Sequence, residues 1–248
     1  MKRPLSPSLA RPAGPVAKQV PLKQATIETL FKVPRRRENV VLLSPVSTAS
    51  TKDVPDDVVY AVDLFAGLGG WSCGARQSGY LIAMAVDNDE GALNIHKHNH
   101  PETAHYRMEL GPETEEQLVR LIRKHVPEGA RWHLHGSPPC QTISNLRCLH
   151  KEDHFDDGMA LVMWYLNLVF KLKPTTWTFE QACEREIMGM LRWLRYSHTD
   201  TLEFSRVDFA DYGLCQHRIR VLAGSPTLLN PFLNDPTLRA PPRVVSDL

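Results

Sequence analysis

The chain has 248 residues, a net charge of +1, 42% hydrophobic residues and a mean hydropathy of −0.29. These values predict a globular protein of one large or two small domains, and no apolar run reaches the ~20 residues that a membrane span needs. The N-terminus lacks the apolar core of a secretory signal. The five cysteines form no CxxC pair, so we expect neither a disulfide framework nor a zinc site. A protein with free cysteines of this kind is expected in a reducing compartment.

Charge is divided unevenly along the chain. Residues 1–55 hold ten lysine and arginine residues against three acidic ones, a net charge of +7, whereas residues 56–248 hold 19 against 25, a net charge of −6. The first segment is also rich in proline and serine, so we expect a mostly disordered basic tail followed by one folded domain over 56–248. A protein that binds a nucleic-acid backbone over a wide area usually has a basic folded domain. The negative net charge of residues 56–248 does not fit this pattern.

Strand and helix patterns alternate beyond the basic tail. Strands are expected at 58–65, 81–86, 105–108, 131–135, 176–180, 202–208 and 219–223. Helices are expected at 70–78, after the second strand to Asn99, and at 113–125, 159–172 and 184–194. This alternation predicts an α/β fold with a parallel sheet and helices on both faces. The last 20 residues carry many prolines and no clear element.

Residues 136–141 read Gly-Ser-Pro-Pro-Cys-Gln and place Cys140 just beyond an expected strand. Proline restricts both its own φ and the residue before it, so the thiol is presented on a stiff loop. The carboxyl end of a strand is where α/β folds place their chemistry. A free cysteine is more often a small buried hydrophobe, but the proline frame favours a functional thiol here.

A glycine-rich turn, DLFAGLGG at 63–70, joins the first strand to a helix. Glycines allow a close approach of the backbone to a ligand, although a tight strand–helix turn would also use them. Asp87 ends the second strand, where nucleoside-binding α/β folds place the acid that binds ribose hydroxyls. Capping the next helix is the alternative, and Asn88 or Asp89 could do this instead. Because no GxxxxGK[ST] motif occurs, a nucleoside ligand is favoured over ATP or NAD.

Glu180 ends a strand at the sheet edge where Cys140 is expected. A carboxylate beside a thiol can act as acid, base or hydrogen-bond partner. Considered by itself, Glu180 would more often be a carboxylate that stabilises the dipole at the start of a helix. Strand alternation places Arg218 and Arg220 on one face of the sheet. Two arginines on one face suit binding of an anion or of the carbonyl groups of a base. The alternative is that they lie on a solvated strand at the edge of the sheet.

Three histidines, His96, His98 and His100, fall in a helical pattern. Residues two apart do not share a helix face, so we expect a solvated helix end and no metal site.

Together these motifs resemble those of the cytosine-C5 DNA methyltransferases. The segments that carry the resemblance, in the order found in that family, are DLFAGLGG (63–70), the region of Asp87, GSPPCQ (136–141), WTFEQ (177–181) and YGLCQHRIR (212–220). The resemblance covers residues 58–225 and implies the Rossmann-like sheet of S-adenosylmethionine-dependent methyltransferases, mostly parallel with a C-terminal antiparallel hairpin. It also implies an enzyme that methylates C5 of cytosine in DNA with S-adenosylmethionine and no metal.

The same resemblance assigns roles to individual residues. The thiolate of Cys140 would add to C6 of a flipped-out cytosine while Glu180 holds or protonates N3. Arg218 and Arg220 would lie near the base and favour the thiolate. The residues implied for the donor site are Asp63, Phe65, Gly67, Gly69, Asp87, Glu109 and Pro138.

Two departures from the family bear on activity. The family's Glu-Asn-Val reads Glu180-Gln181-Ala182 here, so the asparagine that supports local structure is replaced. The family also continues with a target-recognition region and a helix that closes the donor pocket, which we expect this chain to lack. A second chain could supply target recognition. A catalytically inactive scaffold and an RNA cytosine-C5 methyltransferase therefore remain alternatives.

The basic tail contains a segment that resembles the peptide docking on the replication sliding clamp. Gln24, Ile27, Leu30 and Phe31 have the spacing of a 3₁₀ plug for an apolar pocket. The basic run at 34–37 could also be a nuclear-import patch. We therefore expect DNA and a PCNA-like clamp as partners, and a nuclear or other DNA-containing intracellular location.

Overall fold

The computed structural model describes residues 58–139 and 153–241. Cys140 and the clamp-like residues Gln24, Ile27, Leu30 and Phe31 lie outside the described residues, so what is expected of them stays a prediction. The described strands are β1 (Val59–Leu64), β2 (Tyr80–Asp87), β3 (Ala104–Arg107), β4 (Trp132–Gly136), β5 (Thr176–Ala182), β6 (Glu203–Asp208) and β7 (Ile219–Gly224). The helices are α2 (Gly70–Gln77), α3 (Glu90–Asn99), α4 (Glu115–His125), α5 (Asp153–Leu172), α6 (Arg185–Ser197) and α7 (Pro226–Asn234).

The strands form one sheet in the order β3-β2-β1-β4-β5-β7-β6. Strands β1 to β5 run parallel, and β7 lies antiparallel between β5 and β6. This arrangement confirms the predicted fold class, including the antiparallel C-terminal hairpin. The strand order reverses between β1 and β4, and such a switch point leaves a crevice at the carboxyl ends of the two strands.

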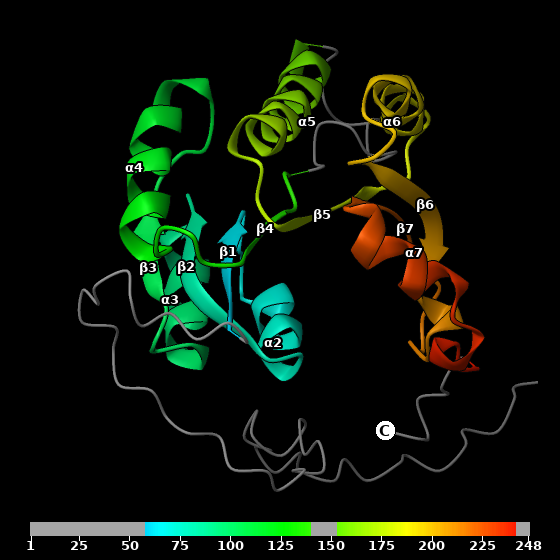
Figure 1. Cartoon of the computed structure of the whole chain (residues 1–248), viewed down its shortest axis with the longest axis horizontal. Coiled ribbons are helices and arrows are strands. Elements are labelled where there is room, and N and C mark those ends of the chain that lie inside the picture. The colour runs from blue at the N-terminus through cyan, green and yellow to red at the C-terminus, as the bar shows by residue number, and fades with distance from the viewer. Residues whose placement is uncertain (1–57, 140–152, 242–248) are drawn as a thin grey trace, which may run out of the picture. The chain divides into compact units, whose positions relative to one another are not determined.

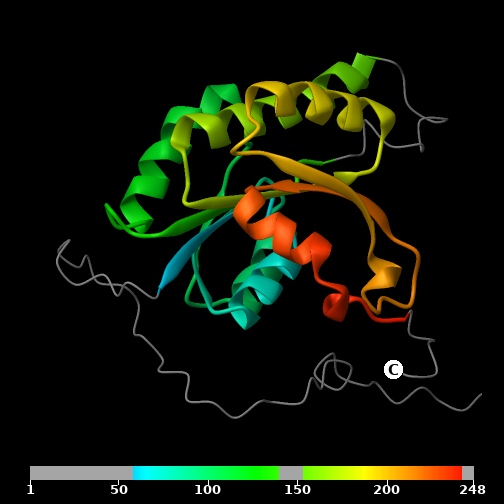
Figure 2. The same ribbon diagram turned by 45° about the vertical axis from the view of Figure 1, so that its right-hand side comes forward.

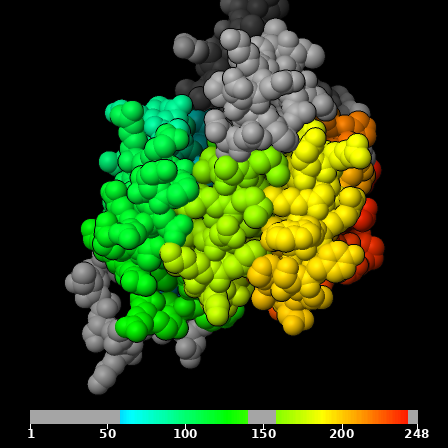
Figure 3. Space-filling view, turned by 90° about the horizontal axis from the view of Figure 1, so that it is seen from above, coloured from blue at the N-terminus to red at the C-terminus, as the bar shows by residue number. Residues whose placement is uncertain are grey.

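Helices cover both faces of the sheet (Figures 1 and 2). One layer holds α4, α5 and α6, which lie side by side in Figure 3, and the other holds α2, α3 and α7. Glu115 on α4 links two of the helices, because it accepts hydrogen bonds from Trp164 and Lys171 on α5. No helix within the two described stretches is long and apolar enough to cross a membrane.

Helix α7 corrects the expectation that the last 20 residues hold no element. Pro226 occupies the first turn of this helix, where no backbone donor is needed, so proline helps to start it. Leu229 is buried beneath the helix, and this packing outweighs the disfavoured Pro231 within it.

The end of β4 is fitted closely against α5. A Cβ placed on Gly136 would lie 2.2 Å from the Tyr165 ring, so this position admits only glycine without a shift of the aromatic side chain. The Tyr165 hydroxyl donates to the Thr178 carbonyl of β5 at 2.8 Å and lies near the Leu134 carbonyl of β4. Tyr165 therefore ties α5 to two neighbouring strands directly before the Ser137–Pro139 loop.

The opposite face of β4 carries two buried histidines under α2. The Trp71 ring stacks on His133 and His135, with ring centroids 5.3 Å and 4.4 Å apart. His133 also hydrogen-bonds Thr176 and Thr178, and His135 hydrogen-bonds Thr178. Burial lowers the pKa of His133 to about 3 and that of His135 to about 4, so both rings are neutral at pH 7.

These two histidines predict acid-sensitive folding. The unfolded chain, in which a histidine pKa is near 6.5, binds more protons than the folded chain between pH 6.5 and 4. The free energy of unfolding should therefore fall as the pH drops through this window, by ~1.4 kcal/mol for each unit of pKa difference. Urea denaturation from pH 7.5 to 4.5 measures this slope. His133→Gln should flatten it, whereas His98→Gln on the exposed face of α3 should not; equal slopes in all three proteins would contradict the prediction.

Candidate functional site

The turn after β1 is held in a left-handed conformation that leaves one side open. Phe65, Gly67 and Gly69 have φ values of 59°, 51° and 90°. At Phe65 this conformation costs ~1–2 kcal/mol, and such local strain is concentrated at functional sites. A Cβ on Gly67 would meet nothing within 4 Å, so a ligand could approach the backbone there.

Two carboxylates follow the neighbouring strands: Asp87 ends β2 beside this turn, and Glu109 lies just beyond the end of β3. Asp87 accepts hydrogen bonds from the Gly67 N–H at 2.8 Å and the Asp89 N–H at 2.9 Å. Asp89, not Asp87, caps α3 by accepting from the Ala92 N–H. The exposed Glu109 accepts from the Asn88 side chain at 2.8 Å. Each carboxylate oxygen has a second lone pair, so Asp87 and Glu109 can still accept from a ligand.

Asp63 lies apart from these groups. Its side chain is 1% exposed, and its Oδ2 accepts from the Ser72 hydroxyl of α2 at 2.6 Å. The structure therefore places this carboxylate beneath the turn, and not among the open donor-side positions expected from the sequence.

The loop after β4 is anchored to its two neighbouring strands. The Ser137 N–H donates to the Leu64 carbonyl at the end of β1. On the other side, the Gln181 amide donates to the Pro138 carbonyl at 2.9 Å and accepts from the Ala182 N–H at 2.7 Å. Gln181 is only 2% exposed. Gln181 therefore supports the local structure itself, a role that the departure from the family's asparagine had put in doubt.

Glu180, the residue before this glutamine, faces two arginines. Arg220 Nε lies 2.9 Å from Glu180 Oε1, and an Arg218 terminal nitrogen lies 3.9 Å from the same oxygen. All three side chains are partly exposed. Strand β7, which carries Arg220, is an interior strand, so the alternative of a solvated edge strand is excluded. The predicted acceptor-side residues Glu180, Arg218 and Arg220 are thus brought together beside the loop that leads to Cys140.

The expectation of a solvated end for α3 is wrong for two of its histidines. His96 and His100 are buried, while His98 is exposed. His96 and His100 are four residues apart and therefore share a helix face, which packs under the glycine turn. This shared face was missed because the expectation rested only on histidines two residues apart. Burial and the neighbouring His96 lower the pKa of His100, and they lower that of His105 on β3 to about 4. Across 58–139 and 153–241, no group of three or more His, Cys, Asp or Glu residues is arranged to hold a metal.

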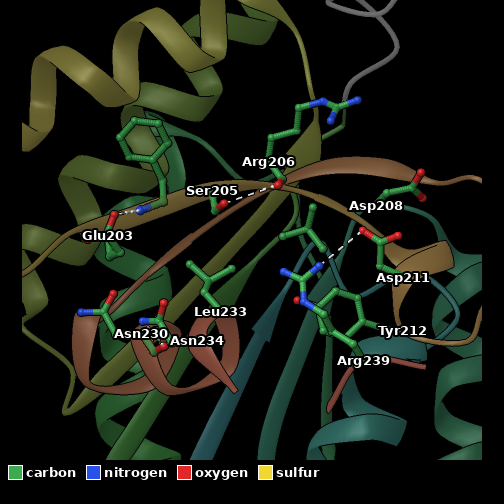
Figure 4. A pocket seen from close by; sticks show the side chains of 12 residues that line it. Glu203, Ser205, Arg206, Asp208, Asp211, Tyr212, Asn230, Leu233, Asn234 and Arg239 are labelled. Carbon is green, nitrogen blue, oxygen red and sulfur yellow. Dashed lines mark hydrogen bonds and ion pairs between the residues drawn. The ribbon is translucent and has the colours of Figure 1, made fainter. Parts of the chain in front are cut away.

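A separate hollow lies at the outer edge of the sheet (Figure 4). It has a volume of about 490 Å³ and is lined by residues of β6, α7 and the segments next to them. Asp211 and Arg239 form an ion pair of 3.7 Å at one side. None of the predicted site residues lines this hollow, so it is distinct from the candidate site.

Comparison with known proteins identifies the family. The family model described as C-5 cytosine-specific DNA methylase matches residues 59–225. The chain belongs to this family. The match covers the glycine turn, the Pro138 loop, Glu180 and both arginines, and it confirms the resemblance found in the motifs.

Individual relatives agree with this assignment. Type II methyltransferase M.HgiDI of Herpetosiphon aurantiacus is 34% identical over 124 residues, which are 50% of this chain and 37% of that protein. M.HgiGI of the same organism is 32% identical over 124 residues, 50% of this chain and 90% of that protein. A solved structure of a DNA modification methyltransferase encoded in an E. coli prophage has a TM-score of 0.51 and 25% identity, over 69% of this chain and 48% of that one. The chain thus spans less than half of two of these three proteins.

The Gln181 contacts predict a specific loss of stability. Gln181→Leu would remove the side-chain partner of the buried Pro138 carbonyl and of the partly buried Ala182 N–H, which should lower the free energy of unfolding by ~1–3 kcal/mol. Gln77→Leu on the exposed surface of α2 makes the same chemical change and should stay within ~0.5 kcal/mol. Chemical denaturation of the two variants tests this, and equal losses would show that the amide does not hold the loop.

Proposed function

We propose that this protein transfers a methyl group from S-adenosylmethionine to C5 of cytosine in DNA, through a covalent bond between Cys140 Sγ and C6 of the base. The observation that carries the proposal is the group formed by Glu180, Arg218 and Arg220 at the carboxyl edge of the sheet. This group lies next to the Pro138 loop, which runs directly into Cys140 and is fixed by Gln181. Membership of the family supports this assignment.

The donor side of the site suits a nucleoside with a charged sulfur. When bound, S-adenosylmethionine would supply an electrophilic methyl group. Phe65 and Gly67 would lie against the donor, Asp87 would accept from its ribose hydroxyls, and Glu109 would face the adenine. Pro138 would close the site from the β4 side. The open space at Gly67 and the free acceptor capacity of Asp87 fit such a ligand.

On the acceptor side, the residues act on the cytosine ring. The Cys140 thiolate forms the S–C6 bond, and the electron pair of the C5=C6 double bond moves toward N3, where Glu180 holds or supplies a proton. C5 then has enamine character and takes the methyl group. A base next removes the C5 proton, and loss of the thiolate restores the double bond. Arg220 and Arg218 orient the Glu180 carboxylate for this role.

The donor-side and acceptor-side residues described above have no assigned role in recognising the target sequence. M.HgiDI and the prophage-encoded methyltransferase extend well beyond the region that they share with this chain, so we propose that a further segment or a second chain provides this recognition. The replacement of asparagine by Gln181 no longer favours an inactive scaffold, because the glutamine makes both local contacts.

Transfer of radiolabelled methyl groups to DNA tests the proposal, with transfer RNA as a second acceptor. The parent protein should label DNA, and Cys140→Ser should label it several orders of magnitude more slowly, because a catalytic nucleophile is lost. Labelling of DNA no faster than by Cys140→Ser would contradict the proposal and leave the scaffold alternative. Labelling of transfer RNA alone would assign the RNA acceptor instead.

A further inference from the structure

The underside of the glycine turn rests on two buried histidines. A Cβ on Gly69 would lie 2.9 Å from His96 Cδ2 and 3.1 Å from His100 Cδ2, so both rings pack against the backbone of the turn. His96 is 0% exposed and His100 is nearly so. Neither ring reaches the open side of the turn, because the Gly69 backbone lies between them and that side.

A chain of hydrogen bonds connects His96, together with His105 of β3, to Asp63. His105 Nε2 lies 2.8 Å from His96 Nδ1, and His96 Nε2 lies 3.2 Å from the Ser72 hydroxyl. The Ser72 hydroxyl in turn lies 2.6 Å from Asp63 Oδ2. The network joins β3, α3, α2 and β1, and Ser72 belongs to the first turn of the helix that Gly69 caps.

The direction of these bonds follows from the donors available. Ser72 has one hydroxyl proton and gives it to Asp63, so its oxygen must accept from His96 Nε2–H. On its other side, His96 Nδ1 shares a hydrogen bond with His105 Nε2. The Ser72 hydroxyl and His96 Nε2–H thus both point toward the Asp63 carboxylate, which is anchored under the turn; within the described part of the chain, its Oδ1 has no hydrogen-bond partner.

We propose that Asp63, Ser72 and His96 are positioning residues for the donor site, which act through the backbone of the Phe65–Gly70 turn without touching the donor. This inference rests on the donor site proposed above, and it replaces the direct contact expected for Asp63. The network fixes the turn in the strained conformation that leaves Gly67 open. Loss of the network lets the turn relax, so that donor binding must first reorder the turn. The affinity for the donor therefore falls, while the turnover of bound donor is preserved.

Calorimetric titration with S-adenosylmethionine measures the effect on affinity. His96→Leu should weaken binding about 10-fold, and Ser72→Ala, which removes one oxygen and changes little else, should act in the same direction. His96→Gln keeps a donor toward Ser72 and should recover part of the affinity. His98→Leu, on the exposed face of the same helix, should bind as the parent does. In methyl-transfer assays, saturating donor should return His96→Leu to the parent rate.

Hydrogen–deuterium exchange of the ligand-free proteins tests the same claim without any donor. The Phe65–Gly70 amides should exchange severalfold faster in His96→Leu and Ser72→Ala than in the parent, with the amides of β5 unchanged. Unchanged exchange in the turn would overturn the positioning role, and so would faster exchange with unaltered donor affinity. A parent protein that does not bind the donor would refute the proposed function, whereas the exchange result would still decide whether the network holds the turn.

Discussion

The Gln181 amide holds the loop that leads to Cys140 against the strand that carries Glu180. Successive residues of a strand point to opposite faces of the sheet, so Gln181 turns into the protein while Glu180 turns out toward the arginines. Two adjacent residues therefore set the position of the loop and of the carboxylate together. A shift of β5 by one residue would exchange these roles, expose the amide and bury the acid.

The same edge of the sheet carries the proposed donor side of the site. Strands β1 and β4 pair in parallel on either side of the switch point, so the turn after β1 and the loop after β4 emerge next to each other. Tyr165 supports the loop from the α5 face, and the buried histidines support the turn from the α3 face. The turn and the loop are thus both backed by packed side chains, and this suits the proposed chemistry, which requires two substrates to meet in a fixed geometry.

Much of this arrangement could be predicted from the sequence. Apolar runs and motif order gave the sheet and its hairpin, and strand alternation placed Arg218 and Arg220 on one face. The direction of Asp63 could not be predicted, because a motif indicates that a residue is needed and not which partner its side chain meets. His96 and His100 were misjudged because their burial depends on how α3 packs under the turn, a tertiary effect. Helix α7 was missed because its prolines indicated a segment without regular structure. The burial of Leu229, which stabilises the helix, depends on the tertiary structure.

Covalent trapping shows directly whether Cys140 Sγ bonds to C6 of the base. A DNA duplex with 5-fluorocytosine has no proton to lose at C5, so the adduct formed after methyl transfer cannot resolve. Incubation with S-adenosylmethionine, followed by digestion and mass spectrometry, should yield a methylated fluorocytosine linked to the peptide that contains Cys140. Linkage through Cys183 or Cys215, or the absence of any adduct under conditions in which donor and DNA both bind, would contradict the proposed bond.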